Sequence, residues 1–271
     1  MLNVTWTGAA GLQFETDKET ILIDPYHTRV DIFNTLLGPI SADTAAIDAR
    51  LPDMKKIAAV IVGHTHSDHA LDVPYIASKS TCTVVGSASM DTLMNLSEMP
   101  GRVRVCSGGE TVSLGDGASV TMIRSTHGLV ILGKVPFPGE IRPTNTLPMK
   151  ASGYRVGTVF APKLQTKDTT FLHVGSANFI EKEMEGHTCD VLFLCVPGWK
   201  KRENYPQRLI EMTQPQTVVL FHYDDFSKPH KRGKSTRRLP FTDIKGLIKV
   251  IKAHAPRLRV MVPEIFETMR F

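Results

Sequence analysis

The chain has 271 residues, of which 42% are hydrophobic and 22% are charged, and its formal net charge is +5 at pH 7. This make-up is typical of a soluble globular protein, and the length is enough for one large domain over residues 1–271. The first residues lack the pattern of a secretory signal, and no apolar run reaches the length of a membrane span. These features favour a cytoplasmic protein.

Strands are predicted where short β-rich runs are bounded by turn residues. Several of the later runs are continuously apolar, as expected for strands that are covered on both faces. Layers of other elements are therefore expected on either side of a sheet. In chain order the predicted strands are Leu2 to Trp6, Gly11 to Phe14, Thr20 to Ile23, Ala58 to Val62, Thr83 to Val85, Ser119 to Arg124, Thr170 to Val174, Val191 to Val196, Thr217 to Phe221 and Arg259 to Met261.

Helices are predicted between these strands, which gives an α/β fold class. The pattern is clearest from Thr242 to Ala253, where Ile244, Leu247 and Ile251 fall on one face of a covering helix. The other predicted helices are one directly after Asp68 and those at Ala88 to Glu98, Phe179 to Glu185 and Tyr205 to Met212.

The segment from Leu129 to Thr169 is rich in proline and glycine and has weak periodicity, so it is expected to form long loops with short strands. Such loops are either walls or lids of a binding site or irregular surface packing. The loop residues that could accept an apolar acyl group are Val130, Ile131, Val135, Phe137 and Ile141.

Four potential metal ligands lie among the six residues from His64 to His69, directly after the apolar run Ala58 to Gly63. So many titratable groups at one strand end would carry desolvation and repulsion costs, which a divalent cation offsets. Neutral imidazole and carboxylate oxygen suit Zn²⁺, with Mn²⁺ and Fe²⁺ as less selective alternatives. His127 and His222 each follow a predicted strand and could complete a metal site.

These motifs resemble those of the metallo-β-lactamase-fold superfamily, and the resemblance extends over nearly the whole chain. It is carried by Thr7-Gly8-Ala9-Ala10-Gly11, by Ile21-Leu22-Ile23-Asp24-Pro25 and by His64-Thr65-His66-Ser67-Asp68-His69. The opening and His222-Tyr223-Asp224-Asp225-Phe226 are most similar to the branch of ascorbate-6-phosphate lactonase-like proteins. The resemblance implies a four-layer αβ/βα sandwich with two sheets back to back, helices outside, and metals at one sheet edge.

The resemblance also implies which residues form the site. Two metals would each have three protein ligands, which are His64, His66 and His127 for the first metal and Asp68, His69 and His222 for the second. Asp24 matches an acidic residue that orients the signature loop through hydrogen bonds.

Ser176 departs from the family pattern, because it stands where a carboxylate usually bridges the two metals. A neutral hydroxyl is a much poorer ligand and leaves one negative charge fewer against two dications. The site would then hold one metal, or two joined only through solvent, or would use a substitute side chain from Asn178 or Asp224. We expect the second metal to be bound more weakly than the first.

The leading hypothesis is a metal-dependent hydrolase in which metal-bound hydroxide attacks a small lactone, carboxylic ester or phosphoester. Asp68 would orient the attacking water or accept its proton. An apolar acyl part would be bound by the loop residues above. A phosphorylated part is suggested by the basic stretch from Lys228 to Arg238, which follows His222 and could approach the site or remain a solvated surface loop.

Two other functions stay open from the sequence. The superfamily includes RNA- and DNA-processing nucleases, and basic residues could bind a nucleic-acid backbone. Against this, the stretch from Lys228 to Arg238 has few aromatic residues and no added recognition domain is evident. The third hypothesis is a metal-binding protein with little turnover, and Ser176 is the observation that motivates it.

Overall fold

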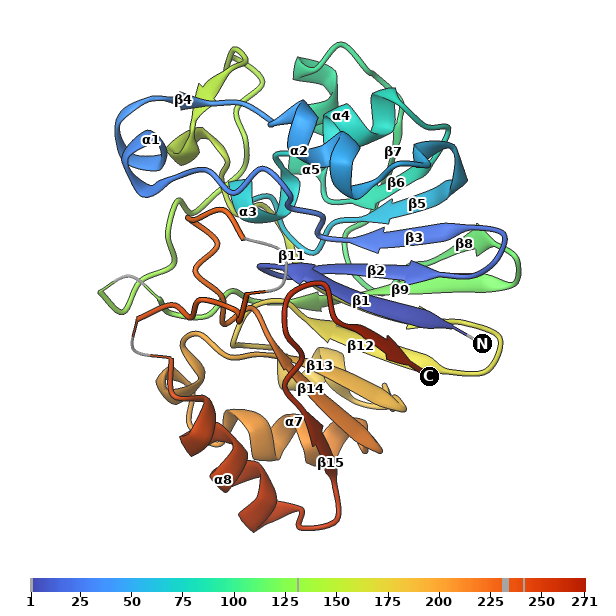
Figure 1. Ribbon diagram of the computed structural model, residues 1–271, viewed down its shortest axis with the longest axis vertical. Coiled ribbons are helices and arrows are strands. Elements are labelled where there is room, and N and C mark those ends of the chain that lie inside the picture. The colour runs from blue at the N-terminus through green and yellow to red at the C-terminus, as the bar shows by residue number, and fades with distance from the viewer. Residues whose placement is uncertain (1, 131, 231–233, 241) are drawn as a thin grey trace.

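The computed structural model describes residues 2–130, 132–230, 234–240 and 242–271. Two seven-stranded sheets lie face to face in the centre, and helices cover the outer face of each (Figure 1). This arrangement confirms the four-layer αβ/βα sandwich. In the described part of the chain, none of the helices has the length and hydrophobicity needed to cross a membrane.

The first sheet combines an antiparallel and a parallel half, in the order β16-β1-β2-β3-β5-β6-β7. The first three strands of the chain and β16 pair antiparallel, whereas β3, β5, β6 and β7 run parallel. Its strands are β1 (Asn3–Gly8), β2 (Gly11–Glu15), β3 (Thr20–Ile23), β5 (Ile57–Ile61), β6 (Thr83–Gly86), β7 (Val103–Val105) and β16 (Thr268–Arg270).

The second sheet has the order β15-β14-β13-β12-β11-β9-β8, with parallel pairing from β12 to β15 and antiparallel pairing elsewhere. A separate two-stranded ribbon joins β4 (Pro39–Ile40) to β10 (Met149–Lys150). The strands of the second sheet are β8 (Thr111–Gly115), β9 (Ala118–Ser125), β11 (Val159–Gln165), β12 (Thr170–Val174), β13 (Val191–Cys195), β14 (Thr217–Phe221) and β15 (Arg259–Met261).

Helices form the outer layers. α2 (Thr44–Arg50), α4 (Val73–Ser78) and α5 (Ala88–Leu96) cover the first sheet, and α7 (Tyr205–Thr213) and α8 (Ile244–His254) cover the second (Figure 1). The other described α-helices are α1 (Ile32–Leu37), α3 (Ser67–Ala70) and α6 (Glu181–Met184). Single 3₁₀ turns are formed by Met54–Lys56, Ala151–Gly153 and Trp199–Lys201.

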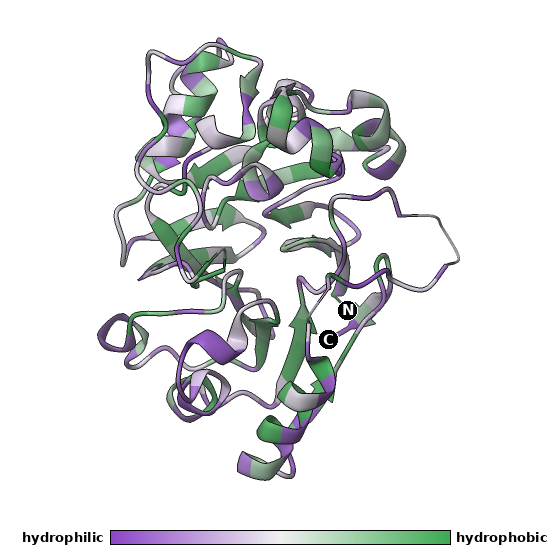
Figure 2. Cartoon of the chain, turned by 90° about the vertical axis from the view of Figure 1, so that its left-hand side faces the viewer, coloured by the Kyte–Doolittle hydropathy of each residue, from purple (hydrophilic) through white to green (hydrophobic). Residues whose placement is uncertain are grey.

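The hydrophobic core is divided by the first sheet. One cluster fills the space between the sheets and continues under α7 and α8, and a second lies between the first sheet and its covering helices. In the first cluster the Phe14 ring packs edge-on against Phe171 with centroids 5.1 Å apart. Accordingly, the strands are mainly coloured as hydrophobic in Figure 2, and hydrophilic residues are concentrated in loops and on helices. Every residue of β13 and β14 is buried, as the apolar runs predicted.

The predicted elements are present, with four of the strands at their expected bounds. The helix expected from Phe179 to Glu185 is a single turn, α6. β11 was missed because Pro162 lies at its centre, and proline cannot donate a ladder hydrogen bond. α1 and α2 were also missed, and both begin after an aspartate, Asp31 or Asp43, that accepts hydrogen bonds from the first turn.

Candidate metal centre

The histidine-rich segment directly follows β5, where the parallel strands of the first sheet end. Gly63 continues from the strand, and α3 begins at Ser67 with His66 in extended conformation before it. This sharp change from strand to helix turns His64, His66 and His69 towards one another, and all three are buried. The local sequence therefore supplies most of the site within six residues.

The first group of donors consists of His64, His66 and His127, whose ligand atoms lie within 4.8 Å of one another. His64 Nε2 is 3.1 Å from His66 Nδ1. The other ring nitrogens are engaged elsewhere: His66 Nε2 donates to the Pro136 carbonyl at 2.9 Å, and His127 Nδ1 donates to the Gly128 carbonyl at 2.7 Å. These bonds fix the tautomers of His66 and His127, so that each of these two rings directs an unprotonated nitrogen to the shared space.

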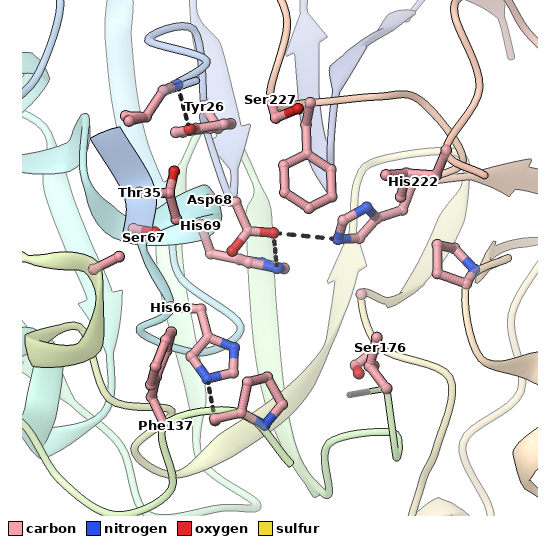
Figure 3. A pocket seen from close by; sticks show the side chains of 18 of the residues that line it. Tyr26, Thr35, His66, Ser67, Asp68, His69, Phe137, Ser176, His222 and Ser227 are labelled. Carbon is pink, nitrogen blue, oxygen red and sulfur yellow. Dashed lines mark hydrogen bonds and ion pairs between the residues drawn. The ribbon is translucent and has the colours of Figure 1, made fainter. Parts of the chain in front are cut away.

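The second group consists of Asp68, His69 and His222, again with ligand atoms within 4.8 Å of one another. Asp68 Oδ2 lies 3.5 Å from His69 Nε2 and 3.5 Å from His222 Nε2, as the dashed lines in Figure 3 show. His222 follows β14 and has a left-handed backbone with φ of 62°. Such a conformation is costly for a side chain with a Cβ, and it brings the His222 ring to the donors after β5.

Asp24 lies behind these donors and is fully buried. Its Oδ2 accepts a hydrogen bond from His69 Nδ1 at 2.8 Å, and its Oδ1 accepts one from the Gly63 amide at 2.6 Å. Asp24 thus holds both the start of the loop and the ring of one donor, which agrees with the orienting role expected for it. His173, from β12, lies 3.8 Å from Asp24 Oδ2 and donates to the Ala10 carbonyl at 2.8 Å.

Burial keeps most of the imidazoles neutral. It lowers the pKa of His66 to about 3 and the pKa values of His127 and His222 to about 4, and it lowers the pKa of His64 well below the ordinary value. For His69, burial lowers the pKa, but the charges of Asp24 and Asp68 together raise it above the ordinary value.

Asp68 is ionised at neutral pH. Burial raises the pKa of its carboxyl group, but the surrounding imidazoles of His69, His222 and His66 lower it by more, and the net pKa is below the ordinary value. Four neutral imidazoles and the Asp68 carboxylate thus offer unprotonated donors around one space, and the His69 imidazole, whose pKa is raised, is the fifth ring of the set. His222 Nδ1 is buried and has no hydrogen-bond partner. This donor set fits one or two divalent metal ions.

Ser176 and Asn178, at the end of β12, contact the segment that carries His127. Ser176 Oγ accepts a hydrogen bond from the Gly128 amide at 2.9 Å, and Ser176 lines the same cavity as the donors. Asn178 Oδ1 accepts bonds from the Phe179 amide and from Arg202, so its carbonyl oxygen is turned away from the donors. Asn178 is therefore not among the side chains that could replace a bridging carboxylate.

Asp224 also does not face the donors, contrary to its expected role as a substitute ligand. It is fully buried, its Oδ1 accepts a hydrogen bond from the Ala9 amide at 2.9 Å, and its Oδ2 pairs with Arg29 Nη2 at 2.7 Å. Both oxygens are thereby engaged in joining the segment after β14 to the turns after β1 and β3. Residues two apart in an extended strand face the same side, but the left-handed backbone of His222 breaks this alternation, so Asp224 and His222 point in different directions.

A cavity of about 300 Å³ opens beside the donors. Its polar wall contains His66, Asp68, His69, His127 and His222. The Tyr26 hydroxyl, which accepts a hydrogen bond from the Val30 amide at 2.8 Å, also lines it (Figure 3). Sequence reasoning missed Tyr26, although its position two residues after Asp24 was a usable signal.

Apolar residues from several segments form the remaining wall of this cavity. Of the loop residues expected to bind an acyl group, Val130 and Phe137 line it, Val135 does not, and Ile141 is buried in the core under the helices. Ile131 lies outside the described residues. The Pro- and Gly-rich loop thus forms part of the binding wall, but with fewer residues than expected.

Among the described residues of the basic stretch and its flanks, only uncharged side chains line the cavity. Phe226, Ser227 and Leu239 line the cavity, whereas none of the described lysines and arginines of the chain does. Lys228 and Lys234 are exposed, and Lys231 and Arg232 lie outside the described residues.

The comparisons with known proteins agree on one family. The family model described as the β-lactamase superfamily domain matches residues 19–223. A protein called a UPF0173 metal-dependent hydrolase, from Cereibacter sphaeroides, is 29% identical over 133 residues, which are 49% of this chain and 52% of the relative. The chain thus spans about half the length of this relative and of three others from the same species.

Two archaeal proteins are similar over longer stretches. A UPF0173 metal-dependent hydrolase of Caldivirga maquilingensis is 25% identical over 242 residues, which are 86% of this chain and 87% of the relative. The solved structure of Igni18, described as a novel metallo hydrolase from Ignicoccus hospitalis, has a TM-score of 0.66 and 18% identity. The similarity covers 100% of this chain and 99% of that one. At this identity the structural likeness shows a shared fold.

Proposed function

Because the chain belongs to the β-lactamase superfamily, as its match over residues 19–223 shows, we propose that it is a metal-dependent hydrolase of small carboxylic esters or lactones. The observation that carries this proposal is the convergence of two three-residue donor groups, of whose six residues all except His64 line one cavity. The names of the UPF0173 relatives support the same activity. A reaction site needs both the donors and room for a substrate beside them, and the cavity provides this room.

His64, His66 and His127 would hold one metal, and Asp68, His69 and His222 would hold a second. The donor set, which is rich in imidazole, favours Zn²⁺, with Mn²⁺ and Fe²⁺ as alternatives. Such a metal supplies an acidified water molecule and a positive charge that polarises the substrate's carbonyl oxygen. Ser176 supplies no negative charge, so the second metal would be held more weakly.

The protein's own groups would orient and deprotonate the reactants. Asp68 lines the cavity as an ionised carboxylate and would accept the proton of the attacking water. Tyr26 accepts a hydrogen bond from the Val30 amide, which leaves its own O–H to donate into the cavity. Burial raises the pKa of this hydroxyl, so it stays protonated and would stabilise the negative charge that develops on the carbonyl oxygen.

The cavity favours esters and lactones over phosphoesters and nucleic acids. A nucleic-acid backbone is bound by lysine and arginine side chains, and none of those described lines the cavity. The phosphate-binding role expected for the stretch from Lys228 to Arg238 therefore has no support from its described residues.

The activity is tested with Asp68→Asn, which removes the proposed proton acceptor but keeps the shape of the side chain. We expect ester or lactone turnover by zinc-loaded protein to fall by at least about 100-fold. Asp116→Asn is the matched control, because its side chain is 47% exposed in a turn and should leave turnover unchanged. Full activity of Asp68→Asn with metal bound would reject the mechanism, and no turnover by the wild-type protein would favour a metal-binding role.

A further inference from the structure

The walls of the cavity differ sharply in chemistry. One side consists of the proposed metal donors, and the rest is mainly apolar. Its apolar residues come from the segment around α1, from the loop after β9 and from the stretch after β14, and they include Val30, Ile32, Val130, Phe137, Phe226 and Leu239. Phe137 lies next to His66, with ring centroids 6.3 Å apart (Figure 3). A ligand that reaches the donors is therefore enclosed by hydrocarbon surface.

The charge of the wall selects against an anionic ligand body. Among the described lining residues there is no lysine or arginine that could pair with an anionic group. Arg29 follows the lining residue Tyr26 in the chain, but it pairs with Asp224 at 2.7 Å and donates to the Lys228 carbonyl at 2.7 Å. A phosphate or sugar acid remote from the donors would be desolvated there without a counterion.

The apolar wall continues outwards onto an exposed rim. Eight large hydrophobic side chains are exposed in the described part of the chain, and all except Val105 lie on two segments at the cavity. Scattered exposed hydrophobic residues are ordinary, but several of them on two segments that also line a cavity indicate a ligand. The rim residues are Ile32, Phe33 and Leu37 of α1, and Leu129, Val130, Leu132 and Phe137 of the loop after β9.

From these observations we propose that the cavity binds a neutral, unbranched acyl chain of medium length, which runs from the metal donors out between α1 and the loop after β9. This inference rests on the proposed function, for which it names the substrate class: esters or lactones of medium-chain fatty acids. A cavity of about 300 Å³ is at the small end of ligand pockets, so it has room for a single medium-length chain. Ile32 and Phe137 would determine specificity because they join the cavity to the rim.

The binding part is tested without turnover or metal. The neutral fluorescent probe N-phenyl-1-naphthylamine is bound to the protein and displaced by 1-alkanols from butanol to decanol. We expect each added methylene to strengthen displacement by about threefold to fourfold until the cavity is filled. Displacement that does not depend on chain length would overturn the inference.

Two substitutions with equal exposure localise the binding. Ile32 and Val105 are each 47% exposed, and only Ile32 lines the cavity. Ile32→Asp should weaken decanol binding by at least about fivefold, because it places a charge beside the chain. Val105→Asp should leave binding unchanged. Equal effects of the two substitutions would contradict a chain that lies along α1.

Kinetics then separate this inference from the proposed function. With zinc-loaded protein and 4-nitrophenyl esters from acetyl to decanoyl, kcat/KM should rise with chain length, and Ile32→Asp should flatten the rise. Hydrolysis with a flat chain-length profile would overturn the acyl-chain inference and leave the hydrolase intact. Alkanol binding that depends on chain length, without hydrolysis of any ester, would overturn the proposed hydrolase function and leave the acyl-chain inference intact.

Discussion

Some polar residues near this site face the metal donors, and others pair with residues elsewhere in the fold. Spacing along the sequence does not distinguish these two kinds of residue. His64, His66 and His69 could be grouped from the sequence because they lie within one turn after a strand. Asp224 lies equally near His222, yet it pairs with Arg29 from a distant turn. The buried salt bridge depends on how the two sheets pack, and one motif carries no information about that contact.

Asp24 is expected to control metal affinity through His69 and the Gly63 amide. In Asp24→Asn one oxygen is replaced by an N–H donor, which weakens the bonds that hold the loop. Affinity for zinc, measured by competition with a chromogenic chelator, should fall about 10-fold to 100-fold. Asp53→Asn, whose side chain is 55% exposed, is the control. Unchanged affinity in a folded Asp24→Asn protein would show that the loop needs no such support.

Asp224 is expected to contribute to stability and not to metal binding. Asp224→Ala leaves Arg29 buried without its partner, so the free energy of unfolding should fall by about 3–5 kcal/mol. The substitution should leave zinc stoichiometry unchanged in protein that remains folded. Denaturant titration and metal analysis of the same variant check both points. Loss of one metal equivalent with unaltered stability of the metal-free protein would restore Asp224 as a ligand.

Among the secondary-structure elements, the strand ends determine where the chemistry lies. β3, β5, β9, β12 and β14 are each followed by a residue that lines the cavity or supports a donor. The strands themselves could be predicted because their apolar runs are short and bounded by turns. The pairing order of the two sheets could not, since it arises from contacts between distant segments. The resemblance to a known family implied the four layers but not that order.

The elements that were not predicted from the sequence were missed for local physical reasons. β11 contains Pro162, which argues against a strand in any single-sequence reading, but the strand pairs with β9 on one side and β12 on the other. α1 has six residues and exposes Phe33 and Leu37, so it lacks the one-sided apolar pattern that identifies α8. The exposed apolar face of α1 is explained by the cavity beside it, which the sequence alone does not reveal.

The end of β12 offers a substitution that should strengthen the second metal site. Ser176→Asp introduces the carboxylate that the family pattern places there, and its oxygen could still accept the Gly128 amide bond that Ser176 Oγ accepts. Affinity for the second zinc ion should rise at least about 10-fold, because one more negative charge balances the two dications. Ser176→Ala is the control and should not raise it. Equal affinities of Ser176→Asp and wild-type protein for the second zinc ion would show that Ser176 is not the cause of weak binding.

For the whole molecule, the buried histidines couple folding to pH. His66 has a folded pKa of about 3, and His127 and His222 have values of about 4, against an ordinary value of 6.5 that the unfolded chain would show. Below pH 6.5 the unfolded state therefore takes up protons that the folded state does not. His69 has a raised pKa and acts in the opposite direction, but it is one group against these three and His64, whose pKa is also lowered.

Metal-free protein should accordingly lose stability as the pH falls from about 6.5 to about 4, by on the order of 3 kcal/mol for each of the three groups. Urea titrations of chelator-treated protein at several pH values measure this loss. His222→Phe should reduce the slope, because one of the three groups no longer titrates. A free energy of unfolding that stays constant or rises over this range would contradict neutral, buried imidazoles.

The most direct test of a metal-dependent hydrolase is to return zinc to chelator-treated protein while following hydrolysis of a medium-chain ester. Turnover should be absent without metal and should increase as zinc is added, with one equivalent bound tightly and a second more weakly. Two equivalents held with equal affinity would contradict the consequence drawn from Ser176. Turnover that is unaffected by removing the metal would contradict the proposed function itself.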